Sequence, residues 1–150
     1  MKTKPFPRKC FNCREQTVSQ VFEDTTLELH HDGRPLTVTV LGLEAEICAT
    51  CDNRTWSYDS AGRIEDALRV AAGLLMPADI LAARLRLGDS PGDIASQLGV
   101  VEAVYARWES GGQLQSAATD KLLRLYFANP ESFRHNVAWP HVPAVTSTAS

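Results

Sequence analysis

The sequence lacks any apolar run long enough to cross a lipid bilayer. A membrane-spanning helix needs about 20 consecutive apolar residues, and charged or polar side chains interrupt this 150-residue chain well before that length. The opening residues MKTKPFPRKC are basic, but no apolar segment follows them, so they do not resemble a secretory signal. We therefore expect a cytoplasmic protein with no membrane partner.

Common catalytic motifs are also missing. The chain has no H-E-x-x-H or H-x-x-E-H string, no glycine-rich phosphate loop and no clear Ser, His and Asp grouping. Its four histidines are scattered along the sequence. We therefore expect that the protein is not an enzyme.

The net charge of −3 is small, but the charges are unevenly distributed. Residues 1–14 hold five basic side chains and no acid, whereas residues 15–60 hold nine acids and two bases, a net charge of −7 (2 − 9). Such an acidic segment is unsuited to contact phosphate groups. Its charge suits either solubility or a basic protein partner.

The only four cysteines form two C-x2-C pairs with 34 residues between the pairs (48 − 13 − 1). Two such turns can supply the four thiolates of a closed, tetrahedral zinc site. Disulfides are an alternative, but a reducing cytosol favours zinc, and redox catalysis would require a βαβ context that the sequence does not show. We predict one structural zinc ion with these ligands: Cys10, Cys13, Cys48 and Cys51. His30 and His31 are expected on a sheet surface, not among the ligands.

The segment between the cysteine pairs has the alternation of β-strands. Strands are expected at residues 17–22, 27–31, 36–40 and 43–48, with a turn at 32–35, which together predict a β-meander. A helix from about residue 61 to residue 75, capped by Asp59 or Ser60, is expected to close this first domain, residues 1–75.

Residues 89–111 predict two short helices joined by a glycine turn. Ser90 is a good N-cap, and Gly99 and Gly111 are good helix stops. The second helix, about residues 102–110, is expected to place Tyr105 and Trp108 in a core. Such a pair is typical of a helix-turn-helix unit, in which the second helix enters the DNA major groove. An ordinary helical hairpin in an all-α domain is the alternative.

Further helices are expected from residue 77 to Gly88, at 119–128 and for one turn after Pro130, which gives a second domain at residues 76–135. Residues 136–150 are expected to form a disordered tail. The predicted fold class is α+β: a small β-rich four-cysteine zinc domain followed by an all-α, repressor-like helix-turn-helix domain.

This order of modules, with the string Ala95-x-x-Leu98-Gly99-Val100 and with Arg107-Trp108-Glu109-x-Gly111, resembles the MqsA antitoxin family over about residues 8–135. In that family a YgiT-type zinc finger is fused to an Xre-like helix-turn-helix domain. The resemblance implies a type II antitoxin whose zinc domain binds a ribonuclease toxin, and whose second domain dimerises and represses its own operon.

The sequence departs from the family pattern where DNA would be read. Ala103 stands where the family has a base-reading Asn, Val101 replaces the usual Ser or Thr cap, and Pro91 replaces a frequent Gln, whereas Arg107 matches a family Arg. These departures put the family's operator sequence in doubt for this protein.

Arg107 is the main predicted base contact, because arginine can form two hydrogen bonds to guanine. An ion pair or a phosphate contact is the alternative for Arg107, and a role at the helix start is the alternative for Glu102. The predicted DNA-contacting set is Arg107, Glu102, Ala103, Ala106 and Ser90.

The expected partners are double-stranded operator DNA, a protein toxin and a second copy of the chain. A stand-alone zinc-containing helix-turn-helix regulator is the alternative function, and a zinc-ribbon adaptor that binds protein is a further one.

Overall fold

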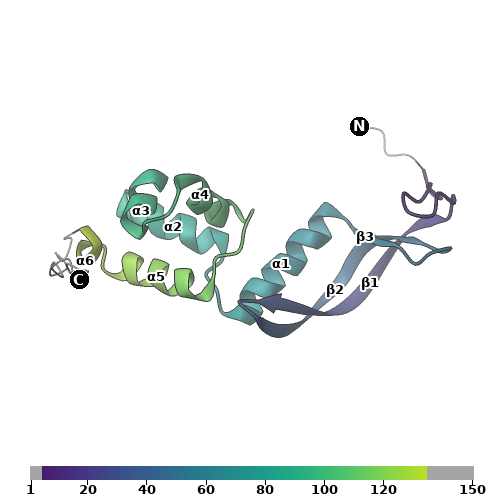
Figure 1. The fold of residues 1–150 in the computed structure, drawn as a ribbon, viewed down its shortest axis with the longest axis horizontal. Helices are drawn as coiled ribbons and strands as arrows, with labels where there is room; N and C mark the ends of the chain where they lie inside the picture. Colours follow the sequence, from purple (N-terminus) through teal and green to yellow (C-terminus); the bar gives the residue numbers. More distant parts are fainter. Residues whose placement is uncertain (1–4, 135–150) are drawn as a thin grey trace, which may run out of the picture.

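The computed structural model describes residues 5–134, and the predicted tail at 136–150 lies outside the described residues. The fold is α+β (Figure 1): a three-stranded antiparallel sheet in the order β1-β2-β3 is followed by helices. The strands are β1 (Val18–His31), β2 (Arg34–Cys48) and β3 (Arg54–Trp56). We call residues 5–75 the sheet module and residues 76–134 the helical module.

The sheet has the antiparallel order of the predicted β-meander, and its first turn lies within the predicted residues 32–35. The predicted short strands are wrong, because they are joined in pairs into β1 and β2, which form one long hairpin. Asp32 and Gly33, both with positive φ, make its turn. Pairing runs from Val18 opposite Cys48 to His31 opposite Arg34, with one irregularity between Glu23 and Thr25. The polar residues that interrupt the alternation therefore form a bulge inside a strand instead of a turn.

Helix α1 (Tyr58–Ala72) lies against one face of this hairpin (Figure 1). The expected start near residue 61 is wrong, since Ser57 is the N-cap and its Oγ accepts the Ser60 N–H at 3.2 Å. Ser60 is buried, and its Oγ accepts the Glu44 N–H of β2 at 2.8 Å. The small core between helix and sheet consists of Val40, Leu43 and Ile64, with Leu27, Leu29, Trp56 and Ala67 packed around them.

The helical module contains α2 (Pro77–Leu87), α3 (Pro91–Leu98), α4 (Glu102–Ser110), α5 (Ala117–Ala128) and α6 (Glu131–Arg134). The bounds of α2, α3 and α4 agree with the prediction, because each helix ends at a glycine in the left-handed conformation and α2 and α3 begin with a proline in the first turn. One buried cluster joins these helices, and its members are Ile80, Ile94, Ala95, Leu98, Tyr105, Trp108, Leu123, Tyr126 and Phe127.

The two modules contact each other directly. At the tip of the hairpin, Asp32 Oδ2 accepts the backbone N–H of Ala117 in α5 at 2.6 Å. In the connecting segment, Asp120 Oδ1 accepts the Leu75 N–H at 2.7 Å, and Gln115 Nε2 donates to the Leu75 carbonyl at 2.8 Å. These hydrogen bonds fix the connection between the modules instead of leaving it as a free linker.

Candidate metal centre and nucleic-acid interface

The four cysteines converge at the far end of the hairpin from its tip. Their sulfur atoms all lie within 4.8 Å of one another, with 3.7 Å between Cys10 and Cys51 and 3.5 Å between Cys13 and Cys48. A tetrahedral ion with metal–sulfur bonds of about 2.3 Å requires sulfur atoms about 3.8 Å apart. The cluster can therefore hold a metal ion.

Both C-x2-C turns have the same backbone geometry. The carbonyl of the first cysteine accepts the N–H of the residue four positions later, Arg14 at 3.1 Å and Asp52 at 2.9 Å. Those two residues have positive φ values of 69° and 55°. Cys10 N–H then donates to Glu15 at 2.7 Å and Cys48 N–H to Asn53 at 3.0 Å. This repeated turn directs each pair of sulfur atoms toward the other pair.

Polar neighbours differ between the cysteines. The Thr17 hydroxyl lies 3.2 Å from Cys48 Sγ. This contact and the backbone N–H groups of Thr50 and Cys51 lower the pKa of the Cys48 thiol to about 6, although burial opposes them. Backbone contact with Asn53 and the Asn12 amide, 3.5 Å away, lower the pKa of Cys51. A thiol with a low pKa is deprotonated at neutral pH and is ready to bind a metal.

Cys13 behaves differently from these two. A backbone hydrogen bond from Glu15 favours its thiolate, but burial and the three neighbouring cysteine sulfurs outweigh that contact and raise the Cys13 pKa to about 12. The metal-free cluster therefore shares its protons unevenly, and metal binding would displace a proton from this position.

The contacts of Thr17 and Asn12 with the cysteines were not predicted, because a Thr or Asn near a cysteine follows no spacing rule. Of the described residues, only the four cysteines form a group able to hold a metal ion. His30 is exposed, and His31 lies at the hairpin tip with its Nε2 3.4 Å from Asp32 Oδ2, so neither belongs to the cluster.

Helix α4 presents one exposed face and one buried face. Tyr105 and Trp108 are buried, with ring centroids 6.2 Å apart in an edge-to-face contact. The opposite face is exposed and carries Glu102, Ala103, Ala106 and Arg107. This division follows from the helical spacing of the two aromatic residues.

Among the described residues, the Arg107 guanidinium has no hydrogen bond or ion pair, so the ion-pair alternative is not observed.

Ser90, unlike Arg107, has partners within the chain. Its hydroxyl donates to Asp93 Oδ2 at 2.6 Å and accepts the Asp93 N–H at 3.1 Å in a capping box. A carboxylate oxygen of Glu102 lies 3.1 Å from where a Cβ on Gly92 would stand, close to the first turn of α3.

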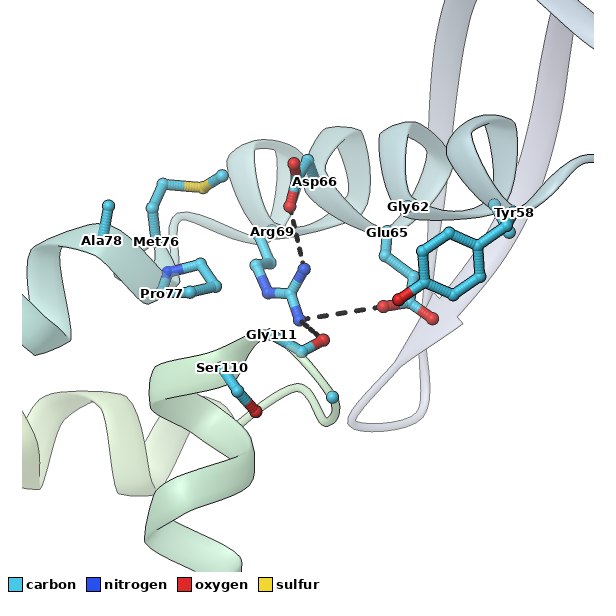
Figure 2. A pocket seen from close by; sticks show the side chains of 12 residues that line it. Tyr58, Gly62, Glu65, Asp66, Arg69, Met76, Pro77, Ala78, Ser110 and Gly111 are labelled. Atoms are coloured by element: carbon cyan, nitrogen blue, oxygen red, sulfur yellow. Dashed lines mark hydrogen bonds and ion pairs between the residues drawn. The ribbon is translucent and has the colours of Figure 1, made fainter. Parts of the chain in front are cut away.

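A cleft of about 510 Å³ lies where α1 meets the ends of α2 and α4 (Figure 2). Its lining includes Tyr58, Glu65 and Asp66 from α1, and Pro77 and Gly111 from the helical module. Arg69 of α1 also lines the cleft, and the sequence analysis missed it because an arginine on an amphipathic helix is usually solvent-exposed.

No protein-family model matches the chain, and no curated protein matches it significantly. None of the helices in the described residues has the length and apolar character needed to cross a membrane.

Proposed function

We propose that this protein is a zinc-stabilised, DNA-binding regulator that acts as the antitoxin of a type II toxin–antitoxin pair and represses its own operon as a dimer. The observation that carries the DNA-binding part is the exposed face of α4, where Arg107 has no side-chain partner among the described residues while Tyr105 and Trp108 anchor the opposite face. A short helix held by α3 in this way resembles the recognition helix of a helix-turn-helix unit.

Zinc is the metal we propose for the cysteine cluster. Four thiolates without oxygen or nitrogen ligands suit a closed structural zinc site, which takes no part in catalysis. The hairpin and α1 share only a small apolar core, so a metal ion would supply stability that this core does not.

The toxin-binding role is proposed for the sheet module. Residues 15–60 carry a net charge of −7 (2 − 9), which would attract a basic, RNA-binding enzyme. Two large apolar side chains of the hairpin are also exposed, Phe22 by 68% and Leu41 by 63%. An acidic surface with exposed apolar side chains suits a protein partner better than DNA.

Co-expression tests the antitoxin role. The full chain would be produced together with the product of the adjacent reading frame, and we expect co-purification and relief of that product's toxicity. If a zinc-loaded, folded protein neither binds nor neutralises that product, the antitoxin proposal fails and a stand-alone zinc-containing regulator becomes the better account.

DNA binding is tested on the segment immediately upstream of the protein's own gene. Arg107→Ala should cost about 1–3 kcal/mol of binding free energy per half-site if the residue contacts guanine, and should relax discrimination at one base pair. Arg107→Lys is the matched control, since lysine keeps the charge but not the two-fold hydrogen bonding. An equal loss of affinity on all sequences with Arg107→Ala, restored by lysine, would make this residue a phosphate contact.

A further inference from the structure

Arg69 is a buried arginine that joins the two modules. Its side chain is only 2% exposed, and it extends from α1 into the cleft toward the end of α4 (Figure 2). The guanidinium donates from Nη1 to Asp66 Oδ1 at 2.9 Å and from Nη2 to the backbone carbonyl of Gly111 at 2.9 Å. Its Nε is buried and has no partner among the described residues. Glu65 Oε2 lies 3.8 Å from Nη2, so two carboxylates of α1 compensate the charge while the guanidinium reaches across to Gly111. Burying an arginine has a desolvation cost even when it is paired, so this position calls for an explanation beyond stability.

The contact with Gly111 is made at the C-terminal end of α4. Gly111 has a φ of 80° and ends that helix, whose last carbonyl groups lack partners within the helix. A cation at this position also complements the negative end of the helix dipole. Gly111 itself caps α4 through its N–H, which donates to the Trp108 carbonyl, and Arg69 of the sheet module binds the carbonyl of this cap residue.

The same last turn of α4 carries Arg107. The Arg107 carbonyl accepts the Gln113 N–H at 3.2 Å, and a Cβ built on Gly112 would lie 3.9 Å from Arg107 Cβ and Cγ. The segment held by Arg69 is therefore hydrogen-bonded to the backbone of Arg107 and lies beside the stem of its side chain. Movement of residues 111–113 would change the direction in which the Arg107 side chain leaves the helix.

A second contact keeps the two modules in one orientation. Asp32 at the hairpin tip accepts the Ala117 N–H, so a carboxylate of the sheet module stands at the positive end of α5. The sheet module thus contacts the negative, C-terminal end of α4 through Arg69 and the positive, N-terminal end of α5 through Asp32. This arrangement resists rotation of one module about the other.

We infer that Arg69 is a positioning residue for Arg107: it holds the last turn of α4 in the geometry in which Arg107 can read a base. This inference rests on the proposed DNA binding and names a residue in the other module that governs its specificity. It requires no contact between Arg69 and DNA, and the buried side chain has no room to make one.

The test is a double-mutant cycle in the full-length, metal-loaded protein. The probe is the DNA segment upstream of its gene, compared with the same duplex altered at the base pair whose discrimination Arg107→Ala relaxes. Arg69→Met keeps an apolar stem and should lower that discrimination by roughly fivefold. In an Arg107→Ala background, Arg69→Met should have no further effect on discrimination, because its action passes through Arg107.

Three comparisons separate positioning from a general loss of stability. The salt dependence of binding should not change with Arg69→Met, because phosphate contacts are untouched. Arg69→Lys should restore part of the discrimination, since a lysine can still donate to Gly111. Arg63→Met is the matched control: Arg63 lies on the same helix but donates to the carbonyls of Leu41 and Gly42 within the sheet module, so it should leave discrimination unchanged.

Additive effects of Arg69→Met and Arg107→Ala, or an equal loss of affinity on both duplexes, would overturn the inference while leaving DNA binding intact. Failure of the unmodified protein to bind the upstream DNA at all would instead defeat the proposed function. In that case, hydrogen exchange of the amides at 107–113 still decides whether Arg69 holds this turn: exchange should be roughly fivefold faster in Arg69→Met than in Arg63→Met. Equal exchange in the two variants would overturn that structural step as well.

Discussion

Thr17 shows how one hydroxyl can influence the cysteine cluster without belonging to it. Its Oγ1 lies 3.2 Å from Cys48 Sγ and 2.9 Å from the Thr50 hydroxyl. Groups that hydrogen-bond to metal ligands orient those ligands and adjust their basicity. The position of Thr17 next to the first residue of β1 is what directs its hydroxyl to the sulfur.

We expect Thr17→Val to weaken metal binding by roughly tenfold, because the valine keeps the shape of the side chain but loses the hydrogen bond to the Cys48 thiolate. Competition with a chromophoric chelator measures the metal affinity. Thr26→Val is the control, since the Thr26 hydroxyl bonds only to that of Thr39, remote from the cysteines. Equal affinities in the two variants would show that the Thr17 hydroxyl has no such effect.

Asp120 is the second residue whose charge matters. Burial alone would raise the pKa of this carboxyl, but hydrogen bonds from Arg124, the Leu75 N–H and Gln115 outweigh burial and lower it. A carboxyl whose pKa is lower in the folded state than in the unfolded state stabilises the fold above the unfolded pKa, about 3.9. That stabilisation is lost as the pH falls through the folded pKa.

Asp120→Asn should therefore reduce the free energy of unfolding by about 1–3 kcal/mol near pH 7. The difference between the two proteins should begin to shrink below about pH 4, where the aspartate of the unfolded chain becomes protonated while that of the folded chain is still ionised. Urea unfolding at a series of pH values measures this. A difference that stays constant down to pH 3 would mean that lost packing, and not the charge, explains the effect.

Among the elements, the β1–β2 hairpin depends on one glycine. Gly42 has a φ of 58°, and its N–H donates to Asp24 Oδ1 at 2.7 Å across the bulge. An L-residue with a side chain is strained in this left-handed conformation, whereas glycine is not. The bulge lets the polar segment near Asp24 pass without ending either strand.

Two alanine substitutions compare this glycine with a helical one. Gly42→Ala should destabilise the protein by about 1–2 kcal/mol through backbone strain, although a Cβ there would meet nothing within 4 Å. Gly62→Ala in α1 also has open space around its Cβ and should stabilise the protein by about 0.5–1 kcal/mol. Urea denaturation gives both values, and effects of the same sign would contradict this explanation.

For the whole molecule, the cysteine cluster is the feature most open to a direct test. We expect elemental analysis to find about one zinc ion per chain. Removal of the metal by a chelator should unfold the two C-x2-C turns and lower the melting temperature, since the four sulfur atoms would lose their shared ligand and two of the cysteines, Cys10 and Cys48, are only 1% and 0% exposed. Calorimetry with and without chelator measures the change. A metal-free protein with an unchanged melting profile would exclude a structural metal.

Several features of this protein follow from the sequence alone. The paired cysteines were placed in one cluster by their spacing, since a C-x2-C turn directs both sulfurs to one side. The bounds of α2, α3 and α4 were predicted closely, because Ser90, Gly88, Gly99 and Gly111 act on backbone groups within one turn of themselves. Burial of Tyr105 and Trp108 likewise followed from their spacing of three residues.

Other features were decided only by the tertiary structure. The four short strands expected between the cysteine pairs form one long hairpin, because strand pairing across the bulge compensates the polar interruption. Helix α1 begins earlier than predicted because Ser60 is used to hold β2 and Ser57 is left as the cap. Capping rules use only neighbouring residues along the chain, so they cannot predict that β2 lies beside Ser60.

The contacts between the modules are the clearest example of features that only the tertiary structure decided. Asp32 and Ala117 are 85 residues apart in the sequence, and Arg69 and Gly111 are 42 apart. An aspartate in a turn and an arginine on a helix are common, so the sequence around Asp32 and Arg69 does not predict that either has a distant partner. Only the packing of α1 against the end of α4 brings the Arg69 guanidinium to the Gly111 carbonyl, because a residue at the carbonyl end of a helix and a distant arginine become neighbours only in the folded chain.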